Sequence, residues 1–181
     1  MPYFSAGVEQ ALHYLVRLVD NGASGAAAPS LRPSARDLAD FYNQPASVAA
    51  KLFTQLEKAG IVTASEGREG GFVLARPLSE ITVLQVVEAI DGRKRLFHCR
   101  EIRGDCAIFN GDAPDWSTRG VCAIHAVMID AEQALRKRLD GVTLAAIADR
   151  AGETIPADFQ QRGGEWFEAR RKQRRMRKPK G

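Results

Sequence analysis

The chain has 181 residues, of which 45% are hydrophobic, 27% charged and 7% aromatic, and its formal net charge is +4. This length and composition suit a globular domain with or without an appendage, and they exclude collagen-like, wholly disordered and disulfide-scaffold proteins. The longest uncharged apolar run, Val121 to Ile129, is too short to cross a bilayer. The N-terminus lacks the pattern of a signal peptide, so we expect a cytoplasmic protein with no membrane partner.

The positive charge is concentrated at the C-terminal end of the sequence. Residues 160–181 hold nine Lys or Arg and two Glu, a charge of +7, whereas residues 1–159 carry a charge of −3. Because the rest of the chain is weakly acidic, the net charge does not by itself indicate that the folded part binds DNA. We expect residues 151–181 to form a basic, disordered tail that is too polar to pack and that could add non-specific DNA affinity.

The first part of the chain is predicted to contain two helices joined by a long loop. Apolar residues from Val8 to Val19 recur every three or four positions, which predicts an amphipathic helix that ends near Asn21. The stretch from Gly22 to Pro33 has turn composition and no periodicity, so we expect a loop. Ser34 and Asp37 then provide an N-cap and a first-turn acid, which predict a short second helix.

A third helix and a hairpin complete this part of the chain. Pro45 restarts the chain after a tight break, and Gly60 is a typical C-terminal stop for the helix that follows. Two short β-rich runs, 61–64 and 72–74, flank a Gly-rich turn and predict a hairpin. This order is typical of a winged helix-turn-helix. We therefore predict a mainly α fold in which residues 1–80 form a winged helix-turn-helix DNA-binding domain.

The region from residue 81 to residue 150 has a different character. Thr82 and Gln85 form a capping-box pattern that predicts a fourth helix. Gly92 to Gly120 has no clear period, and so long an irregular stretch is usually functional or disordered. From Val121 to Leu135 apolar residues step by three and four, which predicts a long C-terminal helix with an apolar seam. Such a seam packs against another long helix, and a two-fold partner subunit is one natural source of that second helix. We predict that residues 81–150 contain a cysteine-containing sensor loop and dimerisation helices.

The third predicted helix is the one that a helix-turn-helix places in the major groove of double-stranded DNA. Lys51 and Gln55 could donate to base edges or phosphates, and Arg68 at the hairpin tip could approach the backbone or minor groove. The outer face of the helix carries Ser47, Ala50, Lys51, Thr54 and Gln55. The alternative interpretation is that these polar residues only cover the solvent side of an amphipathic helix.

Three cysteines, Cys99, Cys106 and Cys122, lie in the irregular stretch and at the start of the long helix. An odd number of thiols in a cytoplasmic chain argues against a disulfide framework. Thiolates are ligands for iron–sulfur clusters and for zinc, and His125, three residues after Cys122, is a candidate fourth ligand. The alternatives are scattered structural thiols, thiol-redox sensing and, less favoured without a Cys-x-x-Cys motif, a thiol enzyme.

Several segments together resemble a known family. They are the run from Asp37 through Lys51 to Val62, the segment Gly70-Gly-Phe-Val-Leu-Ala-Arg-Pro77, and the run Ile81 to Gly92. They are similar to the bacterial Rrf-type regulators, the family of IscR, NsrR and RirA, and the resemblance extends over roughly residues 1 to 150. It implies a homodimeric winged-helix transcription regulator, often a repressor, that binds a dyad operator and senses through an iron–sulfur cluster. The two-iron two-sulfur form is favoured over the four-iron four-sulfur form.

The resemblance also implies the cluster ligands. Cluster-binding relatives have three Cys in this region, which correspond in order to Cys99, Cys106 and Cys122. The fourth ligand in relatives is either the His of a Cys-x-x-His, here His125, or an acidic residue of the first helix of the partner subunit, here Glu9. Two departures from the family pattern are a longer spacing between the second and third Cys, and a Glu at position 66 where relatives have an Arg, for which Arg68 could substitute.

Overall fold

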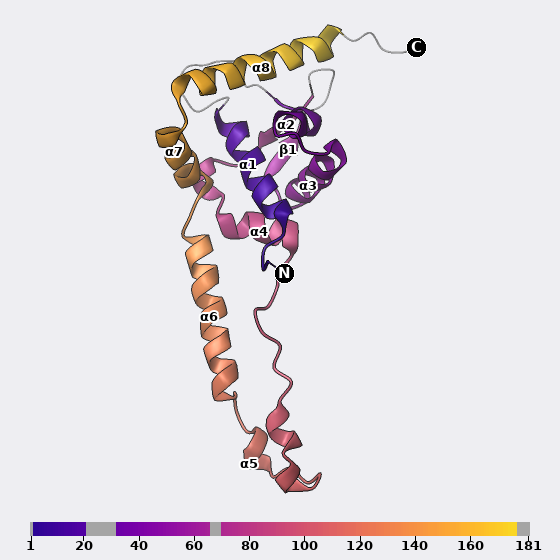
Figure 1. Cartoon of the computed structure of the whole chain (residues 1–181), viewed down its shortest axis with the longest axis vertical. Helices are drawn as coiled ribbons and strands as arrows, with labels where there is room; N and C mark the ends of the chain where they lie inside the picture. Colours follow the sequence, from indigo (N-terminus) through magenta and orange to yellow (C-terminus); the bar gives the residue numbers. More distant parts are fainter. Residues whose placement is uncertain (1, 21–31, 66–69, 177–181) are drawn as a thin grey trace, which may run out of the picture. The chain divides into compact units, whose positions relative to one another are not determined.

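The computed structural model describes residues 2–20, 32–65 and 70–176. The chain divides into two compact units (Figure 1): the first contains residues 1–92 and 140–181, and the second contains residues 93–139. Within the described residues, none of the helices is long and apolar enough to span a lipid bilayer.

The first unit is built around three helices: α1 (Ala6–Asp20), α2 (Ala35–Phe41) and α3 (Ala46–Lys58). Ser34 is the N-cap of α2, as predicted, and Asp37 closes a capping box with it. Asn43, with a φ of 51°, turns the chain between α2 and α3. The buried face of α3 carries Ala49, Leu52, Phe53 and Leu56. The predicted helix-turn-helix is confirmed.

Strands β1 (Val62–Ala64) and β2 (Phe72–Leu74) form the predicted antiparallel hairpin, with Val62 opposite Leu74. The Phe72 amide donates to the carbonyl of Pro33 at 3.0 Å, so β2 is fixed beside the segment that leads into α2. A Cβ at position 71 would lie 2.0 Å from the Arg32 carbonyl oxygen, and only glycine permits this approach. Residues 66–69, including the predicted DNA contact Arg68, lie outside the described residues.

Aromatic and aliphatic side chains from all these elements meet in one core. The ring of Phe53 stacks on Phe72 with a centroid separation of 4.3 Å and on Tyr14 at 6.1 Å. Tyr14, Leu15, Phe53, Ile61 and Ile81 are almost completely buried. This core fixes the orientation of α3 relative to the hairpin.

A second layer covers this core. The turn η1 (Leu78–Glu80) leads into α4 (Val83–Asp91), which packs against α1 and α3. Helix α7 (Leu144–Thr154) returns to the same unit, because the Val83 amide donates to the Val142 carbonyl at 2.8 Å and the Leu144 amide donates to Ile81 at 2.9 Å. The start of α4 and the start of α7 are thereby tied together.

The expectation of a disordered tail from residue 151 is wrong for the residues that the structure describes. Residues 157–176 form α8 (Ala157–Met176), whose Phe167 is only 3% exposed and stacks on Phe41 of α2 at 5.0 Å. Trp166 meets the same ring edge-on at 5.4 Å. The physical reason is that these aromatic side chains share one face of the helix, which the high charge of the segment obscures in the sequence. Residues 177–181 lie outside the described residues.

The second unit contains the predicted irregular stretch, which folds into short turns, and the long helix that follows it. The elements are η2 (Ile102–Asp105), η3 (Ala107–Phe109), α5 (Asp115–Thr118) and α6 (Ala123–Asp140). The segment 93–97 lies along α6, because the Leu96 amide donates to the Glu132 carboxylate at 3.1 Å. The long predicted helix is present, and Val121, Ile124 and Val127 expose 65%, 66% and 64% of their surface.

Candidate functional site

The outer face of α3 is the first candidate site. Ser47, Ala50, Lys51 and Thr54 are all exposed there, on the side opposite the buried residues of the helix. The Thr54 hydroxyl donates to the Ala50 carbonyl at 3.0 Å, which leaves its oxygen able to accept another hydrogen bond. The small Ala50 side chain permits close approach of a partner. The structure thus gathers four predicted DNA contacts on one accessible surface.

Gln55 differs from the other four predicted contacts. It is half-buried, and its Nε2 donates to the Ile90 carbonyl in the last turn of α4 at 3.2 Å. One of the donors expected to reach a base edge is therefore engaged inside the unit. The contact fastens α3 to α4 and sets the angle at which the outer face of α3 is presented.

Exposed cations that were not predicted from the sequence lie next to this face. Arg32 precedes α2 and Arg36 lies in its first turn, and both are exposed. In a helix-turn-helix the first helix crosses the DNA backbone, so a cation in its first turn is well placed for a phosphate. The signal available in the sequence was an Arg two residues after the predicted N-cap Ser34.

The cysteine region is the second candidate site. All three cysteines are free, with Cys99 and Cys122 half-buried and Cys106 exposed between η2 and η3. The Cys99 sulfur accepts a hydrogen bond from the Glu101 amide at 3.4 Å. These thiols lie on the loop that leads into α6 and at the start of that helix.

Arg103 organises this loop. Its guanidinium pairs with the Glu101 carboxylate and donates to the carbonyls of Thr118 and Gly120 at 3.3 and 3.0 Å. The hydrogen bond to Glu101 raises the pKa of Arg103, with smaller contributions from the nearby Cys122 and Cys99 thiols. Arg103 therefore closes the loop on itself and lies next to two of the three cysteines.

Glu101 and His125 belong to the same neighbourhood. The hydrogen bond from Arg103 lowers the pKa of the Glu101 carboxyl, and the charge of Arg103 and that of His125 lower it further. His125 also packs its ring on Phe97 at 5.9 Å. The predicted ligands Cys99, Cys122 and His125 are thus close enough to the Glu101–Arg103 pair to influence it electrostatically.

The donor set fits a thiolate-bound metal centre in its chemistry. Soft sulfur ligands and an imidazole are present on one loop and one helix start, and Arg103 is a cation that could donate to sulfur and offset the negative charge of bound thiolates. Within the described ranges, however, no three His, Cys, Asp or Glu side chains converge as a ready-made metal site. Cys106 is exposed on its turn, and Glu9 is exposed on α1 in the first unit.

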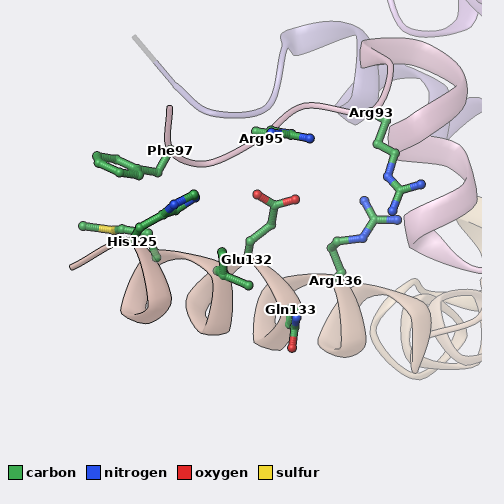
Figure 2. Close-up of a pocket in the computed structure, with 9 residues that line it drawn as sticks. Arg93, Arg95, Phe97, His125, Glu132, Gln133 and Arg136 are labelled. Atoms are coloured by element: carbon green, nitrogen blue, oxygen red, sulfur yellow. The ribbon is translucent and has the colours of Figure 1, made fainter. Parts of the chain in front are cut away.

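A cavity of about 650 Å³ lies beside His125 in the second unit. Figure 2 shows the segment with Arg93 and Arg95 facing Glu132 and Arg136 of α6 across this cavity. His125 and Phe97 lie together at one end of the cavity (Figure 2). The candidate ligand His125 is therefore open to solvent on one side.

Known proteins resemble the chain in sequence and in fold. Residues 4–150 match the Rrf2 family, described as iron-dependent transcriptional regulators. The chain is 29% identical over 109 residues to the HTH-type transcriptional repressor NsrR of Streptomyces coelicolor, an alignment that covers 60% of this chain and 66% of NsrR. It is 27% identical over 124 residues to the HTH-type transcriptional regulator IscR of Serratia proteamaculans, covering 68% of this chain and 69% of IscR.

A solved structure supports the same assignment at the level of the fold. CymR, the global cysteine regulator of Bacillus subtilis, has a TM-score of 0.62 and 20% identity and covers 83% of this chain and 98% of its own. NsrR and IscR are both named as HTH-type regulators of transcription. Because the family model matches residues 4–150, most of its length, the chain belongs to the Rrf2 family of DNA-binding transcriptional regulators.

Proposed function

We propose that this regulator is a homodimeric repressor that binds a dyad operator in the cytoplasm and whose DNA affinity depends on an iron–sulfur cluster. The observation that carries the proposal is the set of three free cysteines on the loop that leads into α6. The repressor role in the name of NsrR and the iron dependence in the family description support it.

The DNA contacts of the proposal lie on α3 and the hairpin. Lys51 reaches base edges or phosphates from the outer face of α3, while Ser47 and Thr54 accept or donate at phosphates that fix the register. Arg68 contacts the backbone or minor groove from the hairpin tip. Gln55 contributes mainly by holding α3 against α4, because its amide is bonded to Ile90.

The homodimer is supported by the apolar face of α6 and the residue that leads into it. Val121, Ile124, Val127 and Met128 are exposed, and none of the described residues of α6 is buried. Exposed apolar residues in a row on a helix are costly in water and are covered when a second copy packs against them. The half-sites of a dyad operator lie about 34–36 Å apart, so a two-fold pair has to present its two α3 helices at that spacing.

The cluster would be held by Cys99, Cys106 and Cys122 with His125 or Glu9 of the partner subunit as the fourth ligand, and the two-iron form is favoured over the four-iron form. Bound there, it would supply sensitivity to iron supply and to oxidants. Arg103 holds the loop in shape through Thr118 and Gly120, and Cys106 would be the third thiolate of the ligand set.

The test is a metal analysis followed by a binding measurement. Iron, acid-labile sulfide and zinc are measured per chain on protein purified without oxygen, and the affinity for a duplex selected from random sequence is compared before and after removal of the metal. We expect iron with matching sulfide, and a change in affinity on its removal. Zinc without sulfide, or equal affinities, would reject cluster control while leaving the DNA-binding regulator intact. The Cys106→Ala variant should lose the metal, and Cys106→Ser serves as a ligand-weakened control.

A further inference from the structure

Helix α8 lies beyond residues 4–150, the part of the chain that matches the family, and it is docked on the helix-turn-helix. Figure 1 shows α8 lying across the end of the first unit that holds α2. Three aromatic side chains of α8 surround Phe41 of α2: Phe167 at 5.0 Å, Trp166 at 5.4 Å and Phe159 at 6.5 Å. Gly163 is buried at the same contact. The position of α8 on α2 is therefore fixed in part by the packing of aromatic side chains.

Ion pairs extend this contact to the C-terminal half of α8. Arg170 pairs with Asp40 of α2 at 2.5 Å, and Arg174 pairs with Asp37. Arg174 also donates to the Arg32 carbonyl at 3.2 Å. Arg32 precedes Pro33, whose carbonyl is bonded to the first residue of β2. The end of α8 is thus attached at the point where α2 and the second strand of the hairpin both begin.

These ion pairs change the charge that α2 presents. Asp37 and Asp40 lie on the helix that crosses the DNA backbone in a helix-turn-helix, and uncovered carboxylates there would repel phosphates. Arg170 and Arg174 pair with both carboxylates. The other charged residues of the surface are basic: Arg32, Arg36, Arg171, Lys172 and Arg175. Glu168, an acid at its edge, pairs with Arg171 at 3.3 Å. The surface next to α2 is therefore positive.

The cations on the outer side of α8 are accessible. The Lys172 side chain is 66% exposed and reaches Glu168 only at 3.9 Å, and Arg175 is exposed as well. Between Ala169 and Met176 the helix contains no acidic residue. This charge pattern complements a row of phosphates, and the position of the surface beside α2, the helix that crosses the DNA backbone, favours contacts to phosphates over contacts to base edges.

We propose that the C-terminal half of α8, residues 169–176, together with Arg32 and Arg36, forms a second DNA-contacting surface that binds the sugar–phosphate backbone next to the phosphates crossed by α2. The surface lengthens the DNA contact of each subunit without adding base preference. This inference rests on the DNA-binding function and adds to it a sequence-independent anchor.

The test compares charge-neutralised variants of one helix. In the double variant Lys172→Gln with Arg175→Gln, both exposed cations are removed while the aromatic contact and the pairs to Asp37 and Asp40 are kept. The matched control is Arg162→Gln with Arg150→Gln, which removes the same charge from exposed positions. Arg162 lies about 15 Å from Lys172 along the helix, beyond the Debye length of about 8 Å at physiological salt.

The measurement is the dissociation constant for a selected operator duplex and for a random duplex over a range of salt concentrations. We expect the slope of log K against log salt to fall by about 0.9 for each phosphate that the variant no longer neutralises, equally for both duplexes, and the control to keep the slope of the parent. A parent slope in the double variant would overturn the α8 surface. Absence of duplex binding by the parent protein would instead count against the DNA-binding function, so the two failures are distinguishable.

Discussion

Gln55 shows how the role of one residue depends on contacts that a sequence pattern does not contain. The helical period places position 55 at the border between the buried and outer faces of α3, and a polar side chain there was predicted to face DNA. The structure supplies a partner from a segment 35 residues away, the Ile90 carbonyl. Lys51, in the middle of the outer face, is exposed as the period predicts. The pattern is thus reliable at the centre of a helix face and ambiguous at its edge.

This difference predicts distinct results for two alanine variants. Gln55→Ala removes one half-buried hydrogen bond, so the free energy of unfolding should fall by about 0.5–1.5 kcal/mol with little change in base preference. Lys51→Ala should leave stability almost unchanged and weaken operator binding. Urea denaturation and binding to a panel of single-base operator variants separate the two effects. A changed base preference in Gln55→Ala alone would show that its side chain leaves Ile90 to read DNA.

The Glu101–Arg103 pair makes a pH prediction. The hydrogen bond from Arg103 lowers the pKa of Glu101 in the folded protein, so the pair is complete above the ordinary pKa of a glutamate and is lost as the pH falls through the lowered value. The side-chain carboxyl resonance of Glu101, followed by NMR, should titrate below the ordinary range. In Arg103→Gln it should return toward that range. An ordinary titration midpoint in the parent protein would mean that the loop closure by Arg103 does not persist in solution.

At the scale of elements, the sequence predicted the three helices, the hairpin and the long helix, because each has its own apolar period or its own caps. It did not predict α8. The segment has nine Lys or Arg from residue 160 onward, and this charge was interpreted as a sign of disorder. Phe159, Trp166 and Phe167 are spaced for one helical face, yet the surface that they cover is the Phe41 ring of a distant helix. A helix of this kind becomes stable only with its tertiary partner.

The packing of α8 can be tested by truncating its buried ring. Phe167→Ala should lower the free energy of unfolding by about 3–5 kcal/mol, or detach α8 in a separate transition, because the side chain is 3% exposed. Phe159→Ala is the matched control on the same helix, since Phe159 is 40% exposed and should cost much less. Both values come from chemical denaturation followed by circular dichroism. Equal losses in the two variants would mean that α8 is not held through Phe167.

The exposed face of α6 gives a prediction about assembly. Ile124→Glu places a charge in the middle of the apolar face, and burying it against a second copy would be unfavourable, so the variant should be monomeric. Gln133→Glu introduces the same group nine residues further along, on the opposite side of the helix, and should leave the dimer intact. Light scattering at several protein concentrations measures the mass of each. A monomeric parent, or a dimeric Ile124→Glu protein, would contradict the proposed interface.

At the scale of the whole molecule, the order of elements was predictable and the connections between them were not. Helix α6 ends at Asp140, whose carboxylate accepts a hydrogen bond from the Thr82 hydroxyl at 3.0 Å, at the N-terminus of α4. The other end of α4 supplies the Ile90 carbonyl to Gln55 of α3. A series of contacts therefore joins the end of the helix that follows the cysteine loop to α3, the helix proposed to contact DNA. The pairing of Thr82 with Asp140, 58 residues apart, left no trace in any local pattern.

If these contacts transmit the response to the cluster, breaking one of them should weaken the coupling between the cluster and operator affinity, while DNA binding itself is retained. Coupling free energies between two sites are typically about 1–3 kcal/mol, and changes along a connecting path alter them by about 0.5–2 kcal/mol. Asp140→Ala removes the acceptor for Thr82 while the Thr82 cap on Gln85 remains. We expect the ratio of operator affinities with and without metal to move toward one, with the metal content and the metal-free affinity unchanged. Asp149→Ala, an exposed acid on α7, is the control that should keep the ratio of the parent. The same ratio in Asp140→Ala as in the parent would show that the cluster acts on α3 by another route, such as the spacing of the two subunits.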